Sequence, residues 1–117
     1  CILKKELRQK IIIEWEGISE RIMRIPIVLT NDLMLSILIL YGPNEDEAKE
    51  EKDNFWETVQ EVFDRAKFPV IVMGDLNGRI RYTTKRTEGT TGKQGEPTRN
   101  EYGTRIIEFG KNNNLIL

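Results

Sequence analysis

The stretch that decides the fold is Phe68-Pro69-Val70-Ile71-Val72-Met73-Gly74-Asp75-Leu76-Asn77-Gly78. Its short, β-branched apolar run predicts a strand that is buried on both faces. Gly74 frees the backbone, and Asp75 and Asn77 follow where the apolar run stops. Residues two apart along a strand point to the same side, so we expect a carboxylate and an amide to be presented together. Open α/β sheets carry their chemistry at the ends of such central strands.

The same residues also fit an ordinary turn. Asp, Asn and Gly are common turn formers, and Asn77-Gly78 is a typical hairpin dipeptide. This stretch taken alone therefore leaves a functional site and a simple turn equally open.

Composition indicates one small globular domain. The chain has 117 residues, of which 38% are hydrophobic and 32% charged, and its net charge of -1 neither favours nor excludes nucleic acid as a partner. The single cysteine, Cys1, permits no internal disulfide, which fits an intracellular setting. The sequence shows no uninterrupted apolar stretch long enough to span a membrane, so no membrane partner is predicted. The chain has no histidine, so it cannot complete a mechanism that needs an imidazole.

Both ends of the sequence resemble cuts in a longer protein. The chain starts at Cys1, and Leu115-Ile116-Leu117 resembles the beginning of a strand. We therefore expect residues 1–117 to be the central part of a single domain that is truncated at both ends.

Three strands are predicted before the central helix, over residues 11–16, 21–29 and 33–41. Pro26 cannot donate to a ladder, so it predicts an edge position or a bulge. The third strand is apolar on both faces apart from Ser36, which indicates a central strand. The polar turn at 30–32 favours an antiparallel hairpin between the second and third strands.

A helix is predicted from Asn44 to about Lys67. Asn44 and Glu47 are spaced almost as in a capping box. Apolar residues at helical spacing form one stripe: Phe55, Val59, Val62, Phe63 and Ala66. The acids of residues 45–53 suit a solvated face at the positive end of the helix dipole.

A basic segment and a second helix follow the deciding stretch. Residues 79–100 lack apolar periodicity, and their basic residues are Arg79, Arg81, Lys85, Arg86, Lys93 and Arg99. Such a segment would attract a polyanion backbone, although an ordinary flexible surface loop is an equally open interpretation. Residues 101–113 predict a helix with Ile106, Ile107 and Phe109 facing inward.

The order strand, helix, strand predicts a parallel βαβ unit whose two strand ends share one edge of the sheet. Tyr41, Asn44, Asp75 and Asn77 would then meet in one cleft. Phosphodiester hydrolysis uses such groups: a carboxylate orients the attacking water, and an amide or phenol donates to the phosphoryl oxygens. A divalent metal would neutralise phosphate charge.

Several motifs resemble the endonuclease/exonuclease/phosphatase superfamily. They are Tyr41-Gly42-Pro43-Asn44 before an acidic helix, then Val70-Ile71-Val72-Met73-Gly74-Asp75-Leu76-Asn77. The segments 19–22, 95–103, 105–109 and 113–115 make the chain most similar to LINE-type retrotransposon endonucleases and craniofacial development protein 2-like proteins.

This resemblance implies a fold and a set of roles. The fold is a partial four-layer α/β sandwich that has a mixed sheet and two main helices. Asp75 would activate the attacking water, Asn77 would stabilise the transition state, and Tyr41 would hydrogen-bond the scissile phosphate. Asn44 and Arg79 would contact the substrate. The implied cofactor is Mg²⁺, the implied partner is the DNA phosphate backbone, and the implied localisation is nuclear.

The chain departs from the family pattern at two essential positions. The family's metal-binding glutamate lies upstream of Cys1, and its catalytic histidine, in a Ser-Asp-His element, lies downstream of Leu117. We therefore expect a fragment of a metal-dependent DNA-nicking endonuclease that is inactive alone. The alternative is a non-catalytic remnant or interaction module that retains the fold core. A generic nucleotide-binding domain would need a Gly-x-Gly-x-x-Gly loop, which the sequence lacks.

Overall fold

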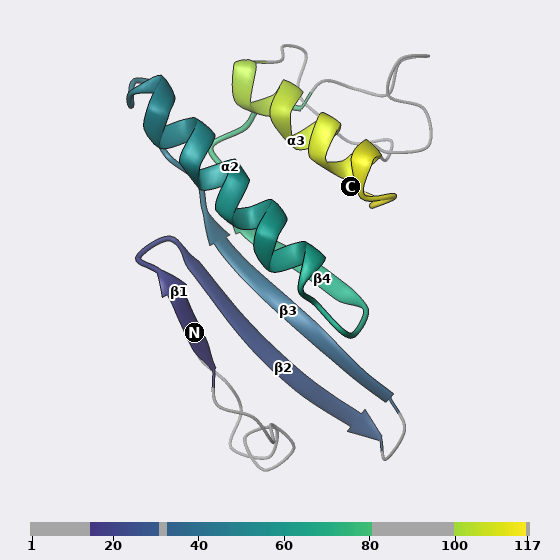
Figure 1. The fold of residues 1–117 in the computed structure, drawn as a ribbon. Coiled ribbons are helices and arrows are strands. Elements are labelled where there is room, and N and C mark those ends of the chain that lie inside the picture. Colours follow the sequence, from purple (N-terminus) through teal and green to yellow (C-terminus); the bar gives the residue numbers. More distant parts are fainter. Residues whose placement is uncertain (1–14, 31–32, 81–99, 117) are drawn as a thin grey trace. The chain divides into compact units, whose positions relative to one another are not determined.

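The computed structural model describes residues 15–30, 33–80 and 100–116 (Figure 1). These residues form a mixed α/β structure with a four-stranded mixed sheet and two helices. The chain divides into two compact units, one formed by Cys1–Gly42 with Ala48–Gly74 and the other by Pro43–Glu47 with Asp75–Leu117.

The sheet belongs to the first unit and follows the chain order. Its strands are β1 (Glu16–Ser19), β2 (Ile22–Thr30), β3 (Leu33–Tyr41) and β4 (Val70–Asp75), arranged β1-β2-β3-β4. β2 is antiparallel to both β1 and β3, whereas β4 runs parallel to β3 (Figure 1). The predicted hairpin, the central position of β3 and the parallel βαβ connection are all confirmed.

Pro26 is tolerated in β2 because its missing N–H would not face β3. Pro26 lies opposite Ser36, and the Ser36 N–H donates to the β4 side of β3. In an antiparallel ladder such a pair is non-hydrogen-bonded, so the proline nitrogen also points away from its partner. On that other side, the described pairing with β1 ends at Arg24. Of the two predicted alternatives, a bulge is absent at Pro26, because the β2–β3 register runs without a shift from Ile22 to Val28. The residues that would continue β1 opposite Pro26, at 11–14, lie outside the described residues, so the edge position stays a prediction.

The helix α2 (Lys49–Asp64) covers one face of the sheet (Figure 1). Its stripe buries Phe55, Val59 and Val62, while Leu38 and Leu40 of β3 are buried in the same unit. The other two predicted stripe residues, Phe63 and Ala66, are only half-buried. The helix ends at Asp64, three residues earlier than predicted.

The predicted start of this helix was wrong. The residue that caps α2 is Ala48, which makes no side-chain capping bond, and the helix begins at Lys49. Asn44 and Glu47 instead close a separate turn, in which the Glu47 N–H donates to the Asn44 carbonyl over 3.2 Å. Glu50 and Glu51 lie in the first helical turn, where carboxylates interact favourably with the helix dipole.

The prediction that β4 is buried on both faces was also wrong. Ile71 and Met73 are each 48% exposed, while Val70 and Val72 are half-buried. β4 is an edge strand of the described sheet, and α2 covers only one of the two sheet faces. An apolar run indicates that its side chains favour burial. Whether they are buried depends on a second layer of structure packing on the other face of the sheet, which the run itself does not encode.

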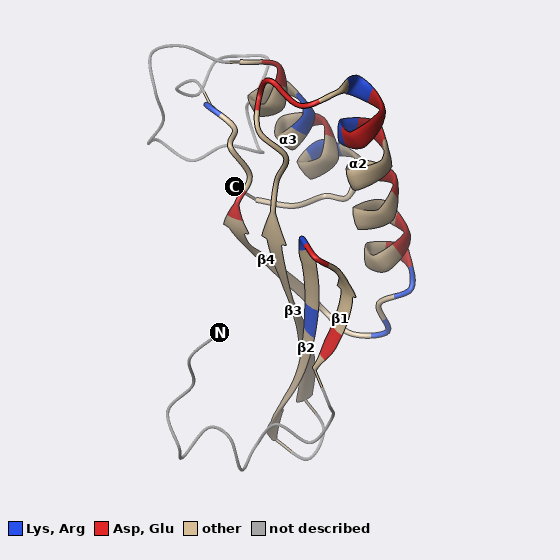
Figure 2. Ribbon diagram, turned by 90° about the vertical axis from the view of Figure 1, so that its left-hand side faces the viewer, with Lys and Arg blue, Asp and Glu red and all other residues tan. Residues whose placement is uncertain are grey.

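Charge is unevenly distributed over the first unit. Figure 2 shows acidic residues along α2 and strands that are almost free of charge. Two of the charged residues on the strands form an ion pair: Arg24 Nη2 on β2 lies 2.7 Å from Glu16 Oε2 on β1. The predicted solvated acidic face is confirmed for α2.

The second unit contains α3 (Glu101–Asn112), within one residue of its predicted bounds. Ile106 and Ile107 are buried as predicted, Phe109 is half-buried, and Tyr102 is fully buried. Beyond the helix, Leu115 and Ile116 form no strand, and Ile116 is largely exposed. The predicted beginning of a strand is therefore wrong for these two residues.

Other predictions lie outside the described residues. These are most of the predicted first strand, at 11–14, the turn residues 31–32 and the basic segment at 81–99. Neither helix in the described part of the chain combines the length and the apolar character needed to cross a bilayer.

Candidate functional site

A polar pocket of about 350 Å³ lies in the second unit. It is lined by Asn44, Glu45, Asp75, Asn77, Gly78, Arg79 and Asn100. Four of the five predicted site residues, Asn44, Asp75, Asn77 and Arg79, therefore line one pocket. Its volume is at the lower end of the range typical of small-ligand sites, and its lining offers carboxylates, amides and a guanidinium.

Asp75 and Asn77 are brought together by a turn and not by strand alternation. β4 ends at Asp75, and Asn77 has a φ of 51°, in the left-handed region. The Asn77 N–H donates to Asp75 Oδ1 over 2.9 Å, which makes an Asx-turn. Asp75 and Asn77 therefore lie close together as predicted, but the cause is a turn, since the backbone leaves the extended conformation between them. The stretch is both a turn and a cluster of polar side chains.

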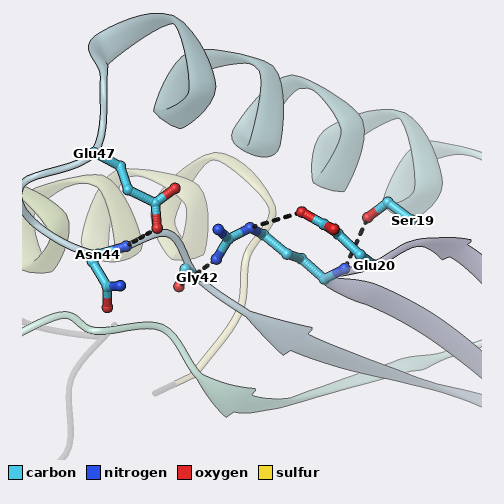
Figure 3. A network of polar contacts seen from close by, with 6 residues as sticks. Ser19, Glu20, Gly42, Asn44 and Glu47 are labelled. Carbon is cyan, nitrogen blue, oxygen red and sulfur yellow. Dashed lines mark hydrogen bonds and ion pairs between the residues drawn. The ribbon is translucent and has the colours of Figure 1, made fainter.

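Asn44 reaches the same pocket from the turn that precedes α2. Its side-chain Oδ1 accepts a hydrogen bond from Asn77 Nδ2 over 3.3 Å. Its backbone N–H donates to the Glu47 carboxylate over 2.9 Å (Figure 3). The turn thus fixes Asn44 at its main chain while its side chain joins the Asp75–Asn77 turn, and no helix-capping role remains for it.

Asn100 is a pocket residue that the sequence did not single out. Its Oδ1 accepts from the Gly103 N–H over 2.8 Å, which caps α3, and also from the Arg79 N–H over 3.0 Å. Its Nδ2 donates to the Asn77 carbonyl over 3.3 Å. An asparagine directly before a predicted helix is a capping signal, so the cap was readable from sequence, but its contacts with the loop at 77–79 were not.

Gly78 brings that loop against α3. A Cβ built at Gly78 would overlap Ile106 Cδ1 and lie 3.3 Å from the Gly103 nitrogen. The absence of a side chain at this position therefore permits the close approach of the loop to the first turns of α3.

Tyr41, the fifth predicted residue, belongs to the first unit. It ends β3, its residue surface is 52% exposed, and the Arg21 guanidinium carbon lies 5.7 Å from the centre of its ring. Arg21 is itself held by Ser19 and by long contacts with Glu20 and Gly42 at the start of β2 (Figure 3). A guanidinium at this distance from an aromatic ring is within cation–π range.

The described residues do not supply a complete metal centre. No group of three or more His, Cys, Asp and Glu side chains converges within residues 15–30, 33–80 and 100–116. The charged groups of the residues that line the pocket are the carboxylates of Asp75 and Glu45 and the guanidinium of Arg79. These three groups sum to a formal charge of -1, which by itself disfavours an anion.

Comparisons with protein-family models, with curated proteins and with solved structures each found no match to this chain.

Proposed function

We propose that the pocket binds a nucleic-acid phosphodiester and that the chain derives from a phosphodiesterase of the endonuclease/exonuclease/phosphatase type. The observation that carries the proposal is the shared pocket of Asn44, Asp75, Asn77 and Arg79. Asn44 was singled out by the motif at 41–44, and Asp75 and Asn77 by the motif at 70–77. Residues from these two separate parts of the sequence line the same pocket.

The chemistry follows from the groups in the pocket. Hydrolysis of a phosphodiester forms a bond from water oxygen to phosphorus and breaks a phosphorus–oxygen bond to the leaving group. Asp75 would orient the water and accept its proton, since a carboxylate is an acceptor when ionised. The turn bond from Asn77 N–H to Asp75 Oδ1 restricts how that carboxylate rotates.

Charge on the phosphoryl oxygens would be stabilised by donors. Asn77 and Arg79 would offer an amide and a guanidinium, and donors aimed at developing charge are a large source of catalysis. Tyr41 remains a predicted phosphate contact, which a Tyr41→Phe variant would test by removing only the phenol hydroxyl.

Mg²⁺ is the proposed cofactor for two reasons: the resemblance to the endonuclease/exonuclease/phosphatase superfamily implies it, and the charged groups of the pocket sum to a negative charge. Mg²⁺ takes oxygen ligands, commonly one or two carboxylates together with substrate phosphates. Asp75 and Glu45 offer that chemistry, although the described residues hold no larger ligand group. A bound Mg²⁺ would offset the negative pocket and neutralise phosphate charge.

The four-layer sandwich is also a proposal. The sheet face opposite α2 carries apolar side chains, including the half-exposed Ile71, Met73 and Leu33. An apolar face of this kind favours a second sheet packed against it, and that packing would convert the observed two layers into the sandwich of the superfamily.

Nicking of supercoiled plasmid tests the function. The chain is assayed with Mg²⁺ and with chelator, beside Asp75→Asn and the control Asp64→Asn. Asp75→Asn keeps the acceptor for Asn77 N–H but loses the charge, whereas Asp64 accepts from Gln60 on α2, outside the pocket. Residues 1–117 are expected to be inactive alone, so nicking by the wild type should not exceed that in the chelator control. Mg²⁺-dependent nicking that persists in Asp64→Asn and falls at least roughly hundredfold in Asp75→Asn would instead mean that this pocket suffices for catalysis.

The second candidate is a non-catalytic module that binds a phosphodiester without cleaving it. The absence of histidine from the chain and of a three-ligand group from its described part favours this alternative. Oligonucleotide binding without nicking, weakened in an Arg79→Ala variant, would support it. Loss of both binding and nicking in the wild type would refute the two candidates together.

A further inference from the structure

We propose that Asn100 is a positioning residue that couples the capped end of α3 to the loop carrying Asp75, Asn77 and Arg79. Its role in activity rests on the proposed function, whereas its role in ordering the loop does not.

The proposal starts from how completely the Asn100 side chain is engaged. An amide oxygen has two lone pairs, and two N–H groups donate to Asn100 Oδ1. One belongs to Gly103 in α3, at 2.8 Å, and the other to Arg79 in the loop, at 3.0 Å. The Nδ2 group donates to the Asn77 carbonyl over 3.3 Å. One side chain therefore bonds the helix and both ends of a three-residue loop segment.

Hydrogen bonds hold the backbone conformation of the loop segment on both sides of Asn77. Asn77 adopts a φ of 51°, in the left-handed region that asparagine enters more readily than most other residues with a side chain. Such conformations persist where their surroundings fix them. The Asp75 carboxylate accepts the Asn77 N–H on one side of this residue, and Asn100 holds the Asn77 carbonyl on the other.

Packing makes the same connection. Gly78 lies so close to α3 that a Cβ there would overlap Ile106, which is buried. The loop is thus fixed by hydrogen bonds at residues 77 and 79 and by contact at residue 78. A shift of the first turn of α3 would move the backbone of Asn77 and Arg79, which carries the side chains of these two pocket residues.

A simple helix cap and a positioning residue predict different results for conservative variants. Serine is a good cap and can accept from a backbone N–H in the first turn. Its oxygen lies one bond closer to the main chain than Asn100 Oδ1 and Nδ2, so a hydroxyl that accepts from Gly103 does not also reach the Arg79 N–H and the Asn77 carbonyl. Asn100→Ser therefore preserves the cap and removes the loop bonds. Asn100→Asp keeps an acceptor for Gly103 and Arg79, but it replaces the Nδ2 donor with a charged oxygen that would repel the Asn77 carbonyl.

The test is amide hydrogen exchange of the full chain, followed residue by residue by NMR. In Asn100→Ser we expect the Arg79 amide to exchange roughly tenfold faster, as for the loss of one hydrogen bond. Amides within α3 should change by less than about twofold, because the cap is retained. In Asn100→Asp, the Arg79 amide should stay as protected as in the wild type.

Asn113→Ala is the matched control. Asn113 caps the other end of α3, and its Nδ2 donates to the Phe109 carbonyl over 2.9 Å. Its removal should leave Arg79 exchange unchanged. Equal Arg79 exchange in the wild type and Asn100→Ser, or an Arg79 amide already unprotected in the wild type, would overturn the positioning role and leave Asn100 as a cap alone.

A second measurement separates this inference from the proposed function. If the wild type nicks plasmid, Asn100→Ser should lower kcat with little change in KM, and Asn113→Ala should lower neither. If the wild type neither nicks nor binds an oligonucleotide, the proposed function fails, and the exchange result alone decides the role of Asn100.

Discussion

Replacing Gly74 by alanine should destabilise the first unit by about 3 kcal/mol. Gly74 has a φ of 142°, where side chains are rarely accepted, and a Cβ at this position would overlap the backbone oxygen of Leu40 on β3. Backbone strain of this kind costs about 1–3 kcal/mol. Moving β4 away from β3 to relieve the overlap would add the loss of at least one ladder hydrogen bond, about 0.5–1.5 kcal/mol.

Urea unfolding followed by far-UV circular dichroism measures the effect. With a slope of about 2 kcal/mol per molar urea, a loss of about 3 kcal/mol lowers the midpoint by about 1.5 M. Gly17→Ala is the control, because a Cβ there would meet only the Trp15 ring at an ordinary 3.5 Å. Its midpoint should move by less than about 0.3 M.

Truncating Leu40 separates a backbone overlap from a side-chain overlap. The atom that a new Cβ would strike is the Leu40 carbonyl oxygen, so Leu40→Ala should not restore stability to Gly74→Ala. A Gly74→Ala midpoint close to that of the wild type would refute the close approach of β4 to β3, as would rescue by Leu40→Ala.

Three further predictions concern individual contacts. Gly78→Ala should destabilise the second unit and be partly rescued by Ile106→Val, which removes the Cδ1 atom that the new Cβ would strike; thermal unfolding without rescue would contradict this. Leu38→Ala, at a fully buried position, should cost about 2–5 kcal/mol in urea unfolding, and a cost below about 1 would contradict its place in the core. The Arg24–Glu16 pair should contribute about 0.2–1 kcal/mol in a double-mutant cycle and fade in 1 M salt, since both side chains are partly exposed.

The elements with strong local patterns were predicted well. β3 has the predicted bounds because its apolar run is closed on one side by Gly42 and Pro43, which end the strand. α3 begins at Glu101 because Asn100 can cap it and apolar residues recur at helical spacing. These signals act within a few residues, so the sequence carries them directly.

Predictions that depended on remote neighbours failed or succeeded for another reason. The apolar run of β4 indicated two covered faces, but β4 is an edge strand with Ile71 and Met73 half-exposed. The capping-box spacing at Asn44 indicated a helix start, but the Glu47 carboxylate closes a turn on the Asn44 N–H instead. The hydrogen bond from the Asn44 N–H to the Glu47 side chain is compatible with both a helix start and an isolated turn. The spacing of these two residues therefore does not distinguish the two structures.

The sequence by itself determined the order of the strands and helices, the βαβ connection and the presence of polar groups at Asn44, Asp75 and Asn77. Periodicity, turn chemistry and chirality fix these features locally. Only the tertiary structure placed Asn100 on the Asn77–Arg79 loop and Gly78 against Ile106. Those contacts join residues more than twenty positions apart, and a contact across such a separation depends on how α3 packs, which no local pattern encodes.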